Sequence, residues 1–247
     1  MENANLNDIL RSNGKLREKF FGNGFKNFVK YIYSDDMLKI QKLVVSPFMM
    51  NCYVLACDQS KDAIVVDAGD NASGIINFIQ QEELNLKFLI NTHAHVDHIS
   101  AVGSIQKQLN VPFYMHKEES RNLAFLLETQ EVYNFGDGLL PKVNEYLDSN
   151  NTYSFGEIEF QVLETPGHSP GSVCFLFDDH IFVGDTLFAG SIGRTDLPGG
   201  SSETIFHSLK EVLMKLDDNL EVHCGHGEDT TIGRERRTNP FLTGNYL

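Results

Sequence analysis

The sequence predicts an α/β protein in which two β-sheets pack face to face and helices cover their outer sides. Two observations support this fold class. Short apolar runs rich in β-branched residues alternate with stretches of helical spacing, and the alternation occurs in two broadly similar sets, one in each half of the chain. The length of 247 residues is compatible with a single domain that buries a sizeable core.

The first set of elements occupies roughly the first half of the chain. Each expected strand is an apolar or β-branched run that ends in turn residues. These strands are expected at 37–45, 51–58, 62–70, 86–93 and 111–116. Helices are expected at 72–84, 98–110 and 117–128. Residues 127–150 are polar and irregular, and we expect them to form a loop over the functional site.

The second set follows the same alternation. A strand-like stretch with a glycine turn is expected over 153–167, and a hairpin over 172–187. The stretch 201–216 predicts an amphipathic helix with a serine cap. A last strand is expected at 220–227 and a closing helix at 230–241.

Residues 1–36 differ in composition from the remainder and show no sustained period. The pattern changes abruptly at Met37, which opens a strand. We therefore divide the chain into an N-terminal extension, residues 1–36, and a domain, residues 37–247. Several aromatic residues of the extension could form one apolar helix face that docks onto the domain: Phe20, Phe21, Phe25, Phe28 and Tyr31.

The charge balance is acidic, with 20 lysine and arginine residues against 34 aspartate and glutamate residues, a net charge of −14. A field of this sign repels phosphate, so a nucleic-acid partner is not expected. It would also disfavour anionic substrates unless bound metal ions or a local arginine cluster reverse the sign inside the site.

The four cysteines are widely spaced, contain no Cys-x-x-Cys pair and follow no secretory signal. A disulfide framework is therefore not expected, and the predicted location is the cytoplasm. No apolar run approaches the ~18 residues of a membrane span, so no membrane association is expected. The sequence does not indicate an oligomeric state.

The stretch "NTHAHVDH", residues 91–98, contains the densest group of metal-binding side chains in the chain. His93 and His95 are two residues apart, so at an extended strand end both point to one side and could chelate one ion. Asp97 and His98 follow where a helix should begin, which turns them toward a neighbouring position. They could serve a second ion.

Further candidate ligands stand at the ends of other segments. His168 lies in the turn "TPGHSPGS", directly after a strand. Asp185 follows one buried strand, and His226 follows another. Each alone is a weak signal, because an isolated His or Asp after a strand is more often a cap or a surface residue.

The order and spacing of these residues, with Asp67 in "VVDAG" ahead of them, resemble the metallo-β-lactamase superfamily from about residue 38 to the end. The stretches "GDTLFAGSIGRTDLPGG" and "TTIGRERRTNPF" resemble the glyoxalase II-like hydrolases, specifically their short bacterial form. The fold implied is a four-layer αββα sandwich, two mixed sheets flanked by helices, with the site at one edge between the sheets.

The resemblance also implies a ligand set. One ion would be held by His93, His95 and His168, and a second by Asp97, His98 and His226. Asp185 would bridge them, and Asp67 would orient a ligand without binding metal itself. The cofactors implied are two divalent ions, zinc first, with iron or manganese as alternatives.

The activity implied is hydrolysis of a small-molecule thioester, such as a hydroxyacylglutathione, by a metal-bridging hydroxide that Asp97 orients. The resemblance extends to persulfide dioxygenases, so a mononuclear iron site built from His93, His168 and Asp185 is the main alternative. A β-lactamase is disfavoured because no export signal is evident, and a non-catalytic module does not explain a complete ligand set.

Arginine side chains are the candidate substrate contacts, because their forks bind carboxylates in pairs of hydrogen bonds. We name Arg194, Arg234 and Arg237, although Arg194 could instead pair with Asp196 and the arginine cluster at 234–237 could be a solvated helix face. The remaining histidines have no partners at ligand spacing and are interpreted as surface or core residues: His116, His180, His207 and His223.

Overall fold

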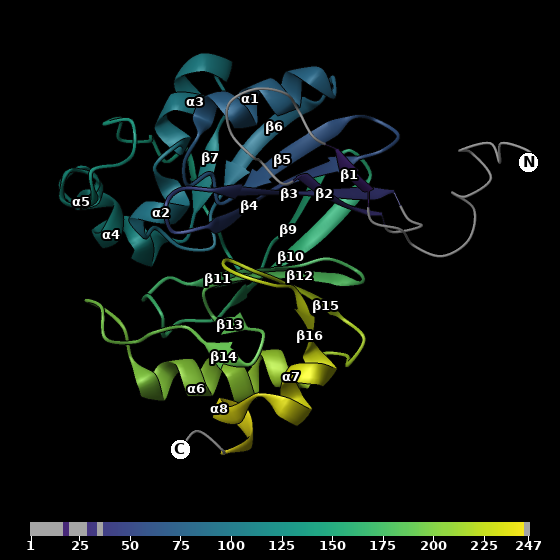
Figure 1. Ribbon diagram of the computed structural model, residues 1–247, viewed down its shortest axis with the longest axis vertical. Helices are drawn as coiled ribbons and strands as arrows, with labels where there is room; N and C mark the ends of the chain where they lie inside the picture. The colour runs from purple at the N-terminus through teal and green to yellow at the C-terminus, as the bar shows by residue number, and fades with distance from the viewer. Residues whose placement is uncertain (1–16, 20–28, 34–36, 245–247) are drawn as a thin grey trace, which may run out of the picture.

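A computed structural model of the chain describes residues 17–19, 29–33 and 37–244. Its elements stack in four layers (Figure 1). Helices α1 (Ala72–Gln81) and α3 (Val102–Leu109) cover the eight-stranded sheet, which packs on the six-stranded sheet, and α6 (Ser202–Glu211) and α7 (Ile232–Thr238) cover the other side. The αββα sandwich expected from the sequence is confirmed.

The eight-stranded sheet holds its strands in chain order. The strands are β1 (Arg17–Lys19), β2 (Val29–Tyr33), β3 (Leu38–Val45), β4 (Met50–Cys57), β5 (Asp62–Val66), β6 (Asn85–Ile90), β7 (Phe113–Met115) and β8 (Glu145–Tyr146). The pairs from β1 to β5 are antiparallel, and those from β5 to β8 are parallel. The parallel strands aim their C-terminal ends at one edge of the sandwich.

Part of the expected N-terminal extension adds strands to this sheet. Strand β2 pairs antiparallel with β3, from Val29 opposite Leu43 to Tyr33 opposite Lys39. Tyr31 therefore lies in a strand and not in a helix. The four phenylalanines named with it lie outside the described residues, and the domain boundary at Met37 stays a prediction.

The six-stranded sheet has the order β16-β15-β12-β11-β10-β9. Its strands are β9 (Thr152–Phe155), β10 (Ile158–Glu164), β11 (Val173–Leu176), β12 (His180–Gly184), β15 (Glu221–Cys224) and β16 (Thr230–Thr231). The expected hairpin is present as β11–β12. The strand-like stretch with a glycine turn forms the hairpin β9–β10, which turns at Gly156 with a φ of 54°. Strands β12 and β15 pair in parallel. A short ribbon of β13 (Leu187–Phe188) and β14 (Ser191–Ile192) stands apart.

The helix expected over 98–110 is interrupted. It forms α2 (Val96–Ile99) and α3, because the Ala101 amide donates to the Ala68 carbonyl instead of continuing the helix. Helix α6 begins as expected at a serine cap, where the Ser201 side chain accepts from the Thr204 amide. The closing helix is α7 followed by α8 (Pro240–Thr243). Among the described residues, no helix has the length and apolar character that crossing a membrane requires.

The expectation of an irregular loop from residue 127 is wrong for its first part. After a 3₁₀ turn at Lys117–Glu119, α4 (Ser120–Ala124) and α5 (Leu126–Tyr133) continue the helical segment to Asn134, whose left-handed φ of 53° ends it. The polar composition of 127–133 reflects an exposed helix that packs on the domain by few residues, of which Leu126 and Gln130 are buried.

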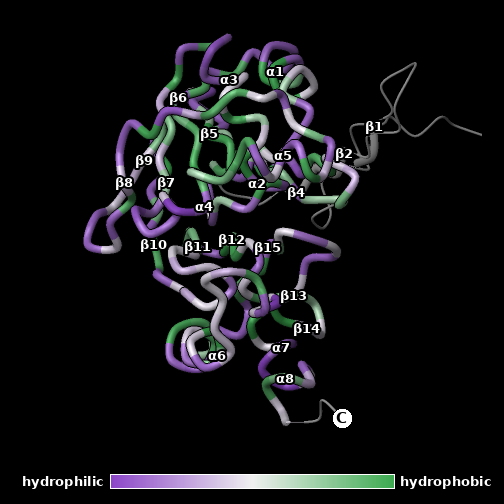
Figure 2. Tube along the Cα trace, turned by 90° about the vertical axis from the view of Figure 1, so that its left-hand side faces the viewer, coloured by the Kyte–Doolittle hydropathy of each residue, from purple (hydrophilic) through white to green (hydrophobic). Residues whose placement is uncertain are grey.

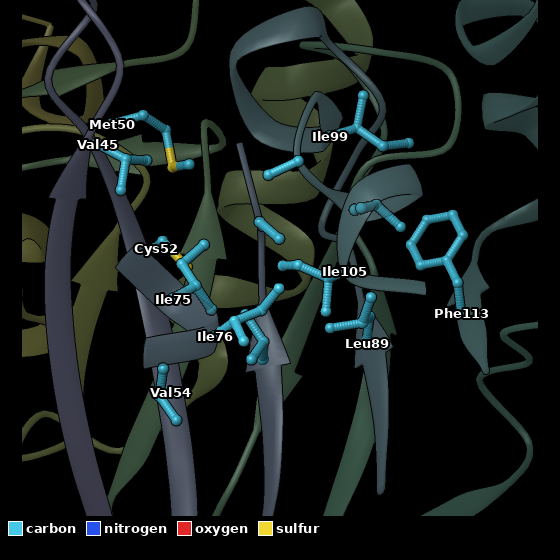
Figure 3. Close-up of a cluster of buried hydrophobic side chains, with 14 of the residues drawn as sticks. Val45, Met50, Cys52, Val54, Ile75, Ile76, Leu89, Ile99, Ile105 and Phe113 are labelled. Atoms are coloured by element: carbon cyan, nitrogen blue, oxygen red, sulfur yellow. The ribbon is translucent and has the colours of Figure 1, made fainter. Parts of the chain in front are cut away.

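Three apolar layers hold the sandwich together. The first lies between α1, α3 and the first sheet (Figure 3) and includes Val54, Ile75, Leu89, Ile105 and Phe113. A phenylalanine-rich layer fills the space between the two sheets, and a third layer lies beneath α6 and α7. Figure 2 shows hydrophobic residues, coloured green, along strands of both sheets. Each fully buried Leu, Ile or Phe contributes about 1.5–3 kcal/mol, so this scaffold positions the loops at its edge firmly.

Candidate metal centre

The candidate ligands lie on loops that leave strand ends of both sheets. Asp67 follows β5, and the stretch 91–98 follows β6 in the first sheet. His168 lies in the loop after β10, Asp185 follows β12, and His226 follows β15 in the second sheet. Residues far apart in the chain thus meet at one edge of the sandwich, as expected for this fold.

His93, His95 and His168 form the first group. His95 Nδ1 lies 2.9 Å from His168 Nε2, and the centroid of the His93 ring is 4.8 Å from that of each of the other two rings. The ligand atoms of all three lie within 4.8 Å of one another. His93 and His168 are buried, and His95 is half-buried beside the cavity described below.

Asp97, His98 and His226 form the second group, and Asp185 adjoins both groups. His226 Nε2 lies 3.1 Å from Asp97 Oδ2. Asp185 Oδ1 lies 3.3 Å from His98 Nε2, while its Oδ2 lies 3.7 Å from both His168 Nε2 and His226 Nε2. One carboxylate therefore faces members of both groups, which is the placement expected of a bridging ligand.

Three buried atoms in this centre test whether a metal fits. Within the described part of the chain, His93 Nε2, His98 Nε2 and Asp185 Oδ1 have no hydrogen-bond partner, because the 3.3 Å approach between the last two lacks hydrogen-bond geometry. Native proteins rarely bury polar side-chain atoms unpaired. A cation would satisfy all three, and His and carboxylate oxygen are ligands of zinc, iron and manganese. The residues fit a metal centre.

The electrostatics keep most of these groups in the form that binds metal. Burial, with the neighbouring histidines, holds the pKa of His93 well below its usual value and lowers the pKa of His95 to about 4. Burial would raise the pKa of Asp185, but His98, His168 and His226 together hold it well below its usual value. His98 is the exception: burial lowers its pKa, and the carboxylates of Asp185, Asp67 and Asp97 raise it well above the ordinary value. A cation would take the place of that proton.

Hydrogen bonds outside the two groups fix the ligand rings. Asp67 accepts from the Thr92 amide and hydroxyl, both at 2.7 Å, and its Oδ2 lies 2.9 Å from His98 Nδ1. His168 Nδ1 lies 2.8 Å from the Arg194 carbonyl, and His226 Nδ1 lies 3.0 Å from the Phe48 carbonyl. Each contact occupies the ring nitrogen that points away from the centre, which sets the ring orientation.

Glu119 ties two ligand loops together, and sequence reasoning missed it. Its side chain is fully buried. Its Oε2 accepts from the Ala94 amide at 2.8 Å, and its Oε1 accepts from the Ser169 hydroxyl at 2.6 Å and the Gly171 amide at 2.8 Å. Nothing in "HKEES" distinguishes Glu119 from its exposed neighbour Glu118, so only the folded chain shows this role.

A cavity of about 650 Å³ opens beside both groups. Its walls include Phe48 from the turn between β3 and β4, and Phe125 and Tyr133 from the two ends of α5. Phe48 and Tyr133 are in edge contact, with 5.5 Å between their ring centroids. Two arginines, Arg121 and Arg194, also line it. The cavity therefore combines an apolar surface, cationic groups and the candidate ligands.

Of the three arginines predicted from the sequence as substrate contacts, one lines the cavity and two do not. Arg194 lines the cavity and also donates two 2.7 Å hydrogen bonds to Asp196, the pairing weighed in the sequence analysis. Arg234 and Arg237 are not among the residues lining the cavity, and Arg237 donates instead to Asp218 at 3.1 Å. Arg121 was not singled out, because one arginine in a charged helix carries no signal in sequence.

Comparison with known proteins decides the family. A profile described as "Metallo-beta-lactamase superfamily" matches residues 45–226. The chain belongs to the metallo-β-lactamase superfamily. The hydroxyacylglutathione hydrolase GloC of Haemophilus influenzae is 36% identical over 215 residues, covering 83% of this chain and 98% of that protein.

Solved structures of the superfamily agree with this membership. The B3 metallo-β-lactamase BLEG-1 superposes with a TM-score of 0.77 at 34% identity, covering 83% of this chain and all of that one. TTHA1623, solved in a di-iron-bound form, superposes with a TM-score of 0.74 at 34% identity, covering 81% of this chain and 99% of the other. As a superfamily member, the chain is a hydrolase-type protein with His and Asp clusters able to bind metal.

Proposed function

We propose that the protein is a glyoxalase II-like hydrolase that cleaves a small-molecule thioester with the help of two metal ions. The observation that carries this proposal is the pair of ligand groups that meet at Asp185. A relative described as a hydroxyacylglutathione hydrolase, matched over nearly its whole length, supports the choice of a thioester.

In this proposal His93, His95 and His168 hold one ion, Asp97, His98 and His226 hold the other, and Asp185 contacts both. Bound ions of this kind supply a water activated at neutral pH and polarise the carbonyl that it attacks. Zinc suits this ligand set, and iron and manganese are the alternatives.

The surrounding residues act on the ligands and on the substrate. Asp67 holds the ring of His98 through Nδ1, so that Nε2 faces the centre. The aromatic wall, Phe48, Phe125 and Tyr133, would bury apolar parts of the substrate and exclude water around them. Arg121, for which no side-chain partner is found among the described residues, would bind an anionic group of the substrate and offset the acidic character of the chain.

The cysteines do not offer a competing nucleophile. All four are buried, and burial raises the pKa of Cys174 and of Cys224 to about 12. The reactive form of cysteine is the thiolate, which neither residue provides at neutral pH. A hydrolytic route that uses water directly is therefore favoured over a covalent intermediate on sulfur.

A mononuclear iron persulfide dioxygenase is the second candidate. His93, His168 and Asp185 would hold the iron. A structural neighbour solved in a di-iron-bound form supports iron as a metal for this fold, although that neighbour holds two ions. Under this alternative, Asp97, His98 and His226 need not bind metal at all.

The two candidates are separated by metal content and by oxygen dependence. We expect about two metal ions bound at this centre, and thioester hydrolysis at equal rates with and without oxygen. His226→Ala should remove about one ion and lower kcat, because the second group loses a ligand. His207→Ala, which alters a helix-borne histidine outside both groups, is the control. One iron per chain, with O₂ uptake on a persulfide substrate, would establish the dioxygenase instead.

A further inference from the structure

A third group of metal-ligating side chains lies away from the centre described above. His180 opens β12, and Glu221 and His223 lie on β15, its parallel neighbour. The register pairs His180 with Glu221 and Phe182 with His223, so these residues share one face of the sheet. Phe182 belongs to the layer between the sheets, which identifies this face as the inner one. His180 precedes Asp185 by five residues of extended chain, about 16 Å, which places the group near the opposite ends of the strands.

The three side chains converge. His180 Nδ1 lies 3.1 Å from His223 Nε2 and 3.6 Å from Glu221 Oε2, and the ligand atoms all fall within 4.8 Å of one another. Metal–ligand bonds of about 2.0–2.2 Å in a tetrahedral site separate neighbouring ligand atoms by about 3.3 Å. The observed separations bracket that value, so an ion could enter with small side-chain movements.

The surroundings of His180 keep its ring available as a lone-pair donor. His180 and His223 are 5% and 0% exposed. Burial, with repulsion from His223, lowers the pKa of His180 to about 4, so its ring is neutral at pH 7. Glu221 has a half-exposed side chain, which supplies a charged ligand and a path from solvent.

The carboxylate of Asp229 lies beside His223, on the Nδ1 side of its ring. His223 Nδ1 and Asp229 Oδ2 are 3.6 Å apart, and neither has a hydrogen-bond partner among residues 37–244. Asp229 is held by Lys42 Nζ at 2.5 Å and by the Tyr53 hydroxyl at 3.3 Å. Burial would raise its pKa, but His223 and Lys42 lower it to about 2, so the carboxylate is ionised. A histidine that binds metal commonly gives its other ring N–H to such a carboxylate.

We propose that His180, Glu221 and His223 form an additional binding site for a divalent transition-metal ion, with zinc as the best match. Two imidazoles and one carboxylate are three ligands of a tetrahedral zinc site, which leaves the fourth position to water. By joining β12 to β15, the ion would stabilise the second sheet from its inner face. This site is independent of the proposed thioester hydrolysis.

The test compares zinc content and cobalt spectra of the full-length protein. After removal of metal and reloading with zinc, Glu221→Gln should hold about one equivalent less than the wild type. Glu159→Gln, an exposed carboxylate on β10 of the same sheet, should match the wild type. The comparison is a difference between variants, so it holds whether the main centre binds one ion or two. Hydrolytic activity should be unchanged in Glu221→Gln.

A double variant and a triple variant distinguish loss of this site from misfolding of the chain. His95→Ala combined with His226→Ala disables both ligand groups of the main centre and should retain one cobalt ion with the visible absorption of tetrahedral coordination. Adding Glu221→Gln should abolish that absorption. Equal zinc content in wild type and Glu221→Gln would overturn the proposal and leave a metal-free, hydrogen-bonded histidine pair. Loss of all cobalt in the double variant would overturn it as well.

Discussion

Replacement of Glu119 by glutamine tests how the two ligand loops are held together. The glutamine has the same shape, but one carboxylate oxygen becomes an amide NH₂. Glu119 accepts from a buried backbone amide on each oxygen, Ala94 on one and Gly171 on the other. In either orientation one of these amides faces the NH₂ group and loses its acceptor.

The magnitude follows from these contacts. A buried N–H left unsatisfied costs about 1–3 kcal/mol, and the loss of charge weakens the remaining bonds by about 1 kcal/mol. We therefore expect Glu119→Gln to lower the free energy of unfolding by about 2–4 kcal/mol. Because the loops that carry His95 and His168 are no longer tied together, metal affinity should fall about 10–100-fold.

Urea unfolding of the metal-free protein and competition titration with a chelator measure the two effects separately. Glu118→Gln, the exposed neighbour, is the matched control and should change both by less than about 0.5 kcal/mol. If Glu119→Gln were as stable as this control and bound metal equally well, Glu119 would not tie the loops as we infer.

Three further predictions follow from other features. A Cβ at Gly225 would lie 2.2 Å from Asp185 Oδ1, so Gly225→Ala should displace that carboxylate. Elemental analysis should then show a lower metal content. Gly227→Asn is the control and should leave the metal content unchanged, because Gly227 lies in open space at a φ of 72°, which asparagine tolerates. In metal-free protein, His180 has a pKa of about 4 in the folded chain and its ordinary pKa of ~6.5 in the unfolded chain. The free energy of unfolding should therefore be highest above about pH 6.5 and fall by about 1–2 kcal/mol as the pH drops toward 4. His180→Gln should flatten this dependence of the unfolding free energy on pH, and an unchanged slope would contradict the assignment. A chain that begins at Met37 should keep its metal, because every candidate ligand follows that residue; loss of metal would show that the extension supports the centre.

The sequence allowed prediction of the features that are local in the chain. The run 91–98 places four candidate ligands within six residues, and the strand-and-helix alternation predicts the layers that surround them. Contacts between residues far apart in the chain could not be predicted. The role of Glu119 depends on the burial of its side chain, and no neighbouring residue in the sequence indicates that burial. His180 and His223 are 43 residues apart and meet only because β12 and β15 pair in parallel. Helix α5 was missed because its exposed, polar sequence lacks an apolar period.

The division of the candidate ligands between the two sheets has a consequence for assembly. Four of them, from His93 to His98, belong to the first half of the chain, and His168, Asp185 and His226 belong to the second. Neither half alone contains a complete centre, so strong metal binding requires both sheets to be formed and docked. Metal that binds only the docked state adds its binding free energy to the association of the halves. Two separately produced fragments, divided in the loop before β9, should therefore reassociate more tightly when metal is present.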